Sequence, residues 1–195
     1  GYPRICKLWR RGTPLSAAET VFAGEPTDMS VRGTVLNTPK RQYHLLGRQM
    51  SFYSARYFAL EKGRQIPLAF PEDADIAAIF KNQLLLLLKS DWNLGSRTLK
   101  QGGLYAIDYD KFLQGDRGFT AVLEPDERSS ISSVTDSKNY VLVTMLRNVR
   151  EEIYRFKWVK GQWLQERIDA PDFGQISVTA TEEGSDRLFF TYSGF

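Results

Sequence analysis

The stretch from Ile131 to Ile168 (ISSVTDSKNYVLVTMLRNVREEIYRFKWVKGQWLQERI) decides the fold class. It divides into four short runs rich in β-branched and aromatic residues, and polar turns separate these runs. The first turn is Asp136-Ser137-Lys138-Asn139, and Trp158 and Trp163 flank the last one. Four short runs joined by tight turns predict a four-stranded antiparallel sheet.

Runs of the same kind fill the rest of the chain and predict an all-β protein. Two segments, Tyr109 to Gln114 and Ala74 to Phe80, could instead form short helices, but neither has the length that an independent helix needs. Grouped in fours, the runs begin near Val31, Ile76, Ile131 and Ile176, a spacing typical of the four-stranded blades of a β-propeller. A β-sandwich is the main alternative, because evenly spaced short strands are typical of it too.

The grouping predicts a partial β-propeller of about four blade equivalents. It consists of three whole four-stranded antiparallel blades between two half blades, which we expect at residues 1–24 (half blade), 30–70, 75–124 and 130–169 (blades) and 175–195 (half blade). The two half blades could pair with each other and close a ring of four. Their exposed edges also make dimerisation of the isolated chain a possibility.

Composition excludes several function classes. Hydrophobic residues make up 42% of the 195 residues and charged residues 25%, so a disordered or collagen-like chain is excluded. The net charge of +3 is too small to indicate a nucleic-acid or membrane-surface partner. The longest apolar run, Leu84 to Leu88, is far shorter than the roughly 20 residues of a membrane-spanning helix, and it predicts a central strand covered on both faces.

Metals, disulfides and cofactors are not expected. Cys6 is the single cysteine and His44 the single histidine, so the chain has no internal disulfide and too few ligands for a closed zinc site. The sequence does not determine the cellular compartment, and we slightly favour the cytoplasm. The chain begins at Gly1 without a leader, which suggests a piece excised from a longer protein.

Individual candidates for catalysis have more ordinary explanations. His44 and Cys6 both lie in strand-like runs and lack the partners that a general base or a nucleophilic thiol needs, so we favour structural roles. Asp108, Asp110 and Asp116 could suggest calcium binding or sugar hydrolysis, but the calcium-loop spacing fails and turn carboxylates are favoured.

The basic and aromatic run from Arg150 to Trp163 (REEIYRFKWVKGQW) could suggest a nucleic-acid interface. Strand alternation instead places Ile153, Arg155 and Lys157 on one face and the aromatic residues Tyr154, Phe156 and Trp158 on the other. We therefore predict that the aromatic face packs in the core.

Several strings resemble the N-terminal propeller of the prolyl oligopeptidase family of serine peptidases. They occur in order over nearly the whole chain: Pro3–Leu15 (PRICKLWRRGTPL), Ser90-Asp91-Trp92, Gly103–Thr120 (GLYAIDYDKFLQGDRGFT), Leu123-Glu124-Pro125 and Phe173–Ala180 (FGQISVTA). The resemblance implies a propeller that restricts access of oligopeptide substrates to a Ser-Asp-His triad in a C-terminal α/β-hydrolase domain.

The catalytic part of that family is not found in the sequence. An α/β-hydrolase nucleophile sits on a Gly-x-Ser-x-Gly elbow, and no two of the 15 glycines lie four positions apart. We therefore expect no catalytic residue in this chain, assign no substrate-binding residue, and expect the hydrolase domain and oligopeptides as partners. The alternative is a stand-alone propeller that acts as a protein-interaction scaffold.

Loop charges give one more hypothesis. In an antiparallel meander, the connections between second and third strands lie at the same rim as the connections between sheets. Acidic residues outnumber basic ones in these connections. In the connections at the opposite rim, between first and second and between third and fourth strands, basic residues outnumber acidic ones. One of the two rims would dock the catalytic domain.

Overall fold

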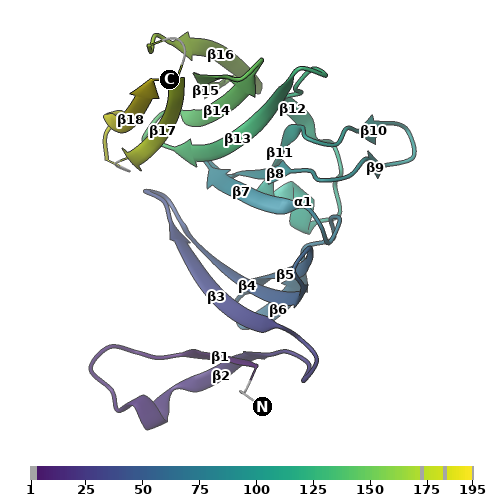
Figure 1. Cartoon of the computed structure of the whole chain (residues 1–195). Helices are drawn as coiled ribbons and strands as arrows, with labels where there is room; N and C mark the ends of the chain where they lie inside the picture. Colours follow the sequence, from purple (N-terminus) through teal and green to yellow (C-terminus); the bar gives the residue numbers. More distant parts are fainter. Residues whose placement is uncertain (1–3, 172–173, 182–183, 195) are drawn as a thin grey trace. The chain divides into compact units, whose positions relative to one another are not determined.

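The computed structural model describes residues 4–171, 174–181 and 184–194, and its regular secondary structure is almost entirely antiparallel strands (Figure 1). The all-β prediction is confirmed. The chain divides into two compact units, Gly1–Ala74 and Asp75–Phe195, which are described separately below. Pro3 and Phe173, the first residues of two family-like strings, lie outside the described residues.

The first unit contains a two-stranded sheet and a four-stranded sheet. The two-stranded sheet pairs β1 with β2, and the larger sheet has the order β3-β4-β5-β6. The bounds are β1 (Ile5–Leu8), the 3-10 turn η1 (Leu15–Ala17), β2 (Glu19–Ala23), β3 (Ser30–Asn37), β4 (Gln42–Ser51), β5 (Ser54–Glu61) and β6 (Arg64–Pro67).

The second unit contains two four-stranded sheets, with the orders β12-β11-β8-β7 and β13-β14-β15-β16, and two-stranded sheets β9-β10 and β17-β18. The first of its sheets consists of β7 (Asp75–Phe80), β8 (Gln83–Leu87), β11 (Leu104–Asp108) and β12 (Thr120–Leu123), with β9 (Trp92–Asn93), β10 (Thr98–Leu99) and helix α1 (Tyr109–Leu113) in its connections. The remaining strands are β13 (Ser129–Asp136), β14 (Val141–Arg147), β15 (Arg150–Val159), β16 (Gln162–Ile168), β17 (Gly174–Thr181) and β18 (Leu188–Gly194).

Two-residue turns with positive φ set the register of the outer hairpins. Lys62 and Gly63 have φ values of 50° and 77°, and Lys160 and Gly161 have values of 49° and 83°. Turns with two positive φ values match the right-handed twist of the flanking strands, and glycine accepts such values without steric cost. These turns therefore close β5-β6 and β15-β16 with the partners directly opposite each other.

The second unit has its core between its two large sheets. Leu84, Leu85 and Leu86 are completely buried, so the predicted central leucine strand is confirmed. Phe156 belongs to the same hydrophobic cluster, and the half-buried Tyr154, Trp158 and Trp163 pack against it. The prediction that the aromatic face of Arg150–Trp163 packs in the core is therefore also confirmed.

The structure tests the two short helices that the sequence allowed and the expected lack of a membrane-spanning helix. Tyr109–Leu113 is helical because Asp108 caps it, its carboxylate accepting a hydrogen bond from the Lys111 amide. Ala74 to Phe80 is not helical: strand β7 occupies Asp75–Phe80, paired with β8. Within the described part of the chain, no helix is long and apolar enough to cross a bilayer.

The segments expected as half blades each form a two-stranded antiparallel sheet. In the first unit β1 pairs with β2, with a register shift between Cys6 and Lys7. In the second unit β17 pairs with β18, with a register shift between Val178 and Ala180. The pairing of the two half blades with each other stays a prediction.

Candidate functional site

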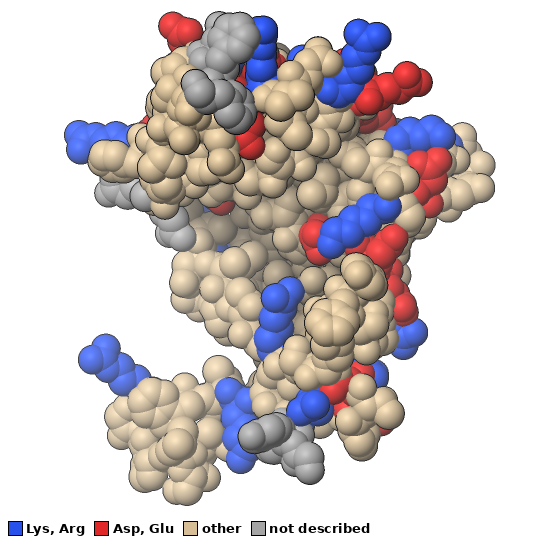
Figure 2. Space-filling view, in the orientation of Figure 1, with Lys and Arg blue, Asp and Glu red and all other residues tan. Residues whose placement is uncertain are grey.

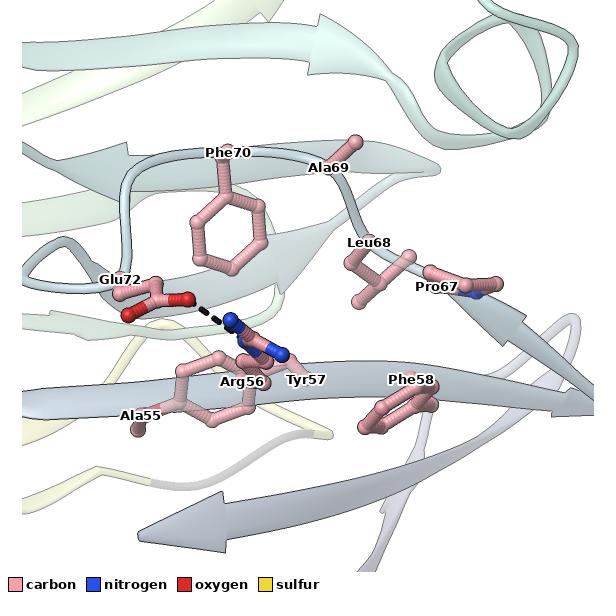
Figure 3. Close-up of a pocket in the computed structure, with 9 residues that line it drawn as sticks. All are labelled: Ala55, Arg56, Tyr57, Phe58, Pro67, Leu68, Ala69, Phe70 and Glu72. Atoms are coloured by element: carbon pink, nitrogen blue, oxygen red, sulfur yellow. Dashed lines mark hydrogen bonds and ion pairs between the residues drawn. The ribbon is translucent and has the colours of Figure 1, made fainter. Parts of the chain in front are cut away.

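A pocket of about 350 Å³ lies in the first unit, between β5 and the segment that follows β6 (Figure 3). The segment is attached to β5 at two points: the Leu68 amide donates to the Tyr57 carbonyl (2.9 Å), and the Ala55 amide donates to the Glu72 carbonyl (2.7 Å). Between these two bonds the chain bows away from β5. The pocket is lined by Ala55, Arg56, Tyr57, Phe58, Pro67, Leu68, Ala69, Phe70 and Glu72.

Aromatic side chains and one ion pair shape this pocket. Phe70 points from the bowed segment toward β5, where its ring centroid lies 5.6 Å from that of Tyr57. The Tyr57 hydroxyl accepts a hydrogen bond from Arg32 Nη2 (3.1 Å). Arg56 Nε donates to Glu72 Oε1 (2.5 Å), and both side chains are about half exposed. The lining can pack an apolar group, and it contains neither a thiol nor an imidazole for catalysis.

His44 and Cys6 lie on strands and are apart from this pocket. His44 is half-buried on β4 opposite Val35, and among the described residues its side chain has no hydrogen bond or ion pair. Cys6 is half-buried on β1 opposite Phe22, and burial raises the pKa of its thiol. A raised pKa leaves less thiolate at neutral pH, so the setting of Cys6 does not favour nucleophilic attack.

The three aspartates occupy turns. Asn82 Nδ2 donates to Asp108 Oδ2 (2.9 Å) and to Asp110 Oδ2 (3.0 Å), which ties the β7-β8 turn to the start of α1. Asp116 Oδ1 accepts a hydrogen bond from the Gly118 amide (2.9 Å). The described residues contain no group of three or more His, Cys, Asp or Glu side chains that could hold a metal ion.

Comparison with known protein families identifies the family of this chain. The family described as prolyl oligopeptidase, N-terminal β-propeller domain, matches residues 2–195. The chain belongs to this family. The propeller interpretation is thereby confirmed over the β-sandwich alternative, and the family recognised from the strings is correct.

The relatives of this prolyl oligopeptidase propeller are much longer proteins. The chain is 28% identical to the uncharacterized peptidase y4nA of Sinorhizobium fredii over 207 aligned residues, which cover 100% of this chain and 28% of that protein. A post-proline cleaving enzyme from Rickettsia typhi has the same fold, with a TM-score of 0.88 at 19% identity, over 98% of this chain and 29% of that one. One of two prolyl endopeptidases analysed for inter-domain dynamics matches with a TM-score of 0.69 at 13% identity, over 96% of this chain and 26% of that one.

Three of the family-like strings, Ser90–Trp92, Gly103–Thr120 and Leu123–Pro125, contribute side chains that pack in the second unit. Trp92 lies edge-on to Phe119, with 5.2 Å between ring centroids, and Phe119 in turn lies edge-on to Phe112 at 5.9 Å. The buried Tyr105 donates its hydroxyl to Glu124 Oε1 (2.6 Å) and accepts from the Lys100 amide (2.7 Å). These three strings therefore have structural roles in the fold.

We expect Tyr105→Phe to lower the free energy of unfolding by about 1–3 kcal/mol, because it leaves the Lys100 amide and Glu124 without their partner. Urea denaturation of the chain measures this loss. Tyr140→Phe is the matched control, since its hydroxyl makes no hydrogen bond among the described residues while its ring lies 4.8 Å from the Arg155 guanidinium. Equal losses in the two variants would contradict the prediction.

The hydrogen bond between Tyr105 and Glu124 also predicts how stability depends on pH. Burial, and then the hydrogen bond to Glu124, raise the pKa of Tyr105 to about 12. Because the folded-state pKa is raised, this contribution to stability is complete below the ordinary tyrosine pKa of about 10 and is lost as the pH rises toward 12. The free energy of unfolding of Tyr105→Phe is therefore expected to fall less steeply than that of the wild type as the pH rises from about 10 toward 12.

Sequence reasoning did not identify the pocket residues. Tyr57 and Phe70 are 13 positions apart, and backbone hydrogen bonds bring them together. An aromatic residue in a strand followed by another in a connection is common, so no local pattern could have marked this pair.

Proposed function

We propose that this chain is the non-catalytic propeller region of a prolyl-oligopeptidase-like serine peptidase. It would restrict the access of substrates, admitting oligopeptides and excluding folded proteins, to a Ser-Asp-His site in a C-terminal α/β-hydrolase domain. The observation that carries this proposal is the family match over residues 2–195 together with the short share, 28%, of the peptidase relative that the chain covers.

The chemistry of the described residues supports a non-catalytic role. Among the described residues, the side chain of the half-buried His44 has no hydrogen bond to a serine or a carboxylate, and burial raises the pKa of the Cys6 thiol. Inter-domain dynamics have a role in catalysis and specificity in two prolyl endopeptidases, one of which has this fold. A propeller that controls access would act through such movement relative to its catalytic domain.

The decisive experiment compares this chain with the protein extended through its downstream reading frame. Both are assayed on a proline-containing fluorogenic peptide, and the extended protein is also given a folded protein that contains the same cleavage sequence. We expect hydrolysis of the peptide by the extended protein alone, and little or no cleavage of the folded protein.

Each other result contradicts a different part of the proposal. Activity of the short chain would mean that it contains a catalytic site. Inactivity of both proteins would favour the stand-alone scaffold, which needs no chemistry. Rapid cleavage of the folded protein would support a peptidase but contradict the control of access.

A further inference from the structure

The pocket between β5 and the segment after β6 is short and is closed at both ends. Its ends are the hydrogen bonds from the Leu68 amide to the Tyr57 carbonyl and from the Ala55 amide to the Glu72 carbonyl. Because of these two bonds, an extended chain cannot pair along β5 as an added strand here. The volume of about 350 Å³ lies at the small end of the range typical of ligand pockets, about 300–1,000 Å³. A ligand of this pocket is therefore a small molecule or a very short peptide.

Two backbone groups of β5 face the pocket without a partner. The N–H and C=O of one residue in an antiparallel pair point to the same side, so the Tyr57 amide and the Ala55 carbonyl face the bowed segment. The Leu68 carbonyl, which would accept from Tyr57 in a regular ladder, accepts from the Phe70 amide instead (3.0 Å). Among the described residues, neither the Tyr57 amide nor the Ala55 carbonyl has a hydrogen-bond partner. Both residues are buried, and buried backbone groups are normally paired, so the pocket offers one donor and one acceptor to a ligand.

One cation and one anion line the same pocket. Arg56 Nε donates to Glu72 Oε1 (2.5 Å), and the two side chains are about half exposed. Within the described part of the chain, the terminal nitrogens of Arg56 and the second carboxylate oxygen of Glu72 make no hydrogen bond. Figure 3 shows a terminal nitrogen of Arg56 directed away from Glu72, toward the end of the pocket where Leu68 lies. The pair therefore has spare donors for a carboxylate and a spare acceptor for an ammonium group.

The rest of the lining is apolar. It consists of the side chains of Ala55, Pro67, Leu68 and Ala69 and of aromatic rings, among which Phe70 points toward β5 (Figure 3). Such a lining makes dispersion contacts with an apolar side chain of a ligand. On the face of the molecule shown in Figure 2, acidic and basic side chains lie beside each other. A surface of mixed charge does not attract ligands of one net charge, so the pocket suits a ligand whose own charges cancel.

We propose that this pocket binds a zwitterionic dipeptide that has an apolar side chain. The carboxylate of the dipeptide accepts hydrogen bonds from the terminal nitrogens of Arg56 and from the Tyr57 amide. Its ammonium group donates to Glu72 and to the Ala55 carbonyl, and its apolar side chain packs against Phe70. The Arg56–Glu72 bond stays intact, since it uses neither the terminal nitrogens nor the second carboxylate oxygen.

Charge complementarity selects this occupant over others. An uncharged apolar molecule would leave the spare donors and acceptors of the pocket unpaired. A longer peptide would hold its ammonium group and its carboxylate too far apart to reach both ends of one short pocket. That such dipeptides are present rests on the proposed function, because a peptidase releases short peptides with free ammonium and carboxylate ends. The binding itself needs only residues of the first unit.

Ligand-observed NMR titration of the extended protein with the dipeptide Ala-Phe tests the proposal. We expect saturable binding, and we expect Arg56→Met and Glu72→Gln each to raise its Kd about tenfold, because each removes a charged hydrogen-bond partner. Ala-Phe amide lacks the carboxylate, so its weaker binding is expected to be insensitive to Arg56→Met. N-acetyl-Ala-Phe lacks the ammonium group, so its weaker binding is expected to be insensitive to Glu72→Gln.

Arg41→Met is the matched control for Arg56→Met. Arg41 forms an ion pair of 2.7 Å with Glu61 in the same sheet, and neither residue lines the pocket. We expect this variant to bind Ala-Phe with the Kd of the wild type. Exposed ion pairs contribute little to stability, so the thermal unfolding midpoint of Arg56→Met is expected to stay close to that of the wild type. A change in Kd would then not be a consequence of unfolding.

Several results would overturn the dipeptide site while leaving the proposed function intact. They are a lack of saturable binding, a Kd that is the same in Arg56→Met and Glu72→Gln as in the wild type, and equal affinities for Ala-Phe and its two blocked forms. In each case the extended protein would still hydrolyse the fluorogenic peptide. Binding that follows the expected pattern in an extended protein without peptidase activity would instead support the site and contradict the proposed function.

Discussion

Leu85→Ala is expected to lower the free energy of unfolding of the second unit by about 3–4 kcal/mol, through lost burial and the cavity that it leaves. Leu85 is completely buried on β8, opposite Ala78 and Ala106 on the neighbouring strands. Small residues on both sides leave little nearby side-chain volume that could fill the cavity. Equilibrium denaturation in urea measures the loss.

Leu85 packs in a core that both four-stranded sheets of the unit share, so we expect its loss to lower the free energy of unfolding strongly. Leu85 belongs to one cluster with Leu104, Val143 and Phe156, which come from both four-stranded sheets of the unit. Leu164→Ala on β16 is the control: its side chain is 52% exposed, so a change within about 0.5 kcal/mol is expected. A loss at Leu85 no larger than this would contradict the assignment of a shared core.

In the first unit, Asp28→Asn is expected to cause a marked loss of stability at neutral pH. The Asp28 side chain is 2% exposed, and its carboxylate accepts hydrogen bonds from Arg48 Nε (2.8 Å), Arg48 Nη2 (3.0 Å) and the Glu25 amide (2.7 Å). An amide in its place cannot neutralise the Arg48 guanidinium, which is itself mostly buried. The environment is tight as well, because a Cβ atom at Gly24 would collide with Asp28 Oδ2.

The loss at Asp28 has a defined pH dependence. The hydrogen bond from Arg48, against an opposing effect of burial, lowers the pKa of Asp28. Because the folded-state pKa is lowered, the stabilisation is complete above the ordinary aspartate pKa of about 4 and is lost as the pH falls through the folded value. Thermal unfolding midpoints of the wild type and Asp28→Asn are therefore expected to converge in acid.

Arg56→Met is the control for Asp28→Asn, since the Arg56–Glu72 pair is about half exposed and an exposed pair contributes little. A difference between wild type and Asp28→Asn that stays constant from neutral pH down to pH 3 would contradict the role of the carboxylate charge.

The sequence determined those features that depend on local periodicity. The alternation in Arg150–Trp163 identified the face with Phe156 as buried, and the leucines from Leu84 identified a central strand. Side chains on a strand point alternately to opposite faces, so a short window contains this information. The family-like strings also suggested the propeller, because they include residues that pack it, such as Trp92 and Phe119.

Tertiary structure decided which strands and side chains meet. Periodicity predicts a strand but does not identify its partner, because any exposed strand edge can pair with another. Strands β9 and β10 were not predicted, since two residues are too few to show a period. The pocket between Tyr57 and Phe70 depends on hydrogen bonds between β5 and the segment that follows β6, which are distant in the sequence. These contacts form only after folding brings their partners together, and this is the reason why local sequence could not specify them.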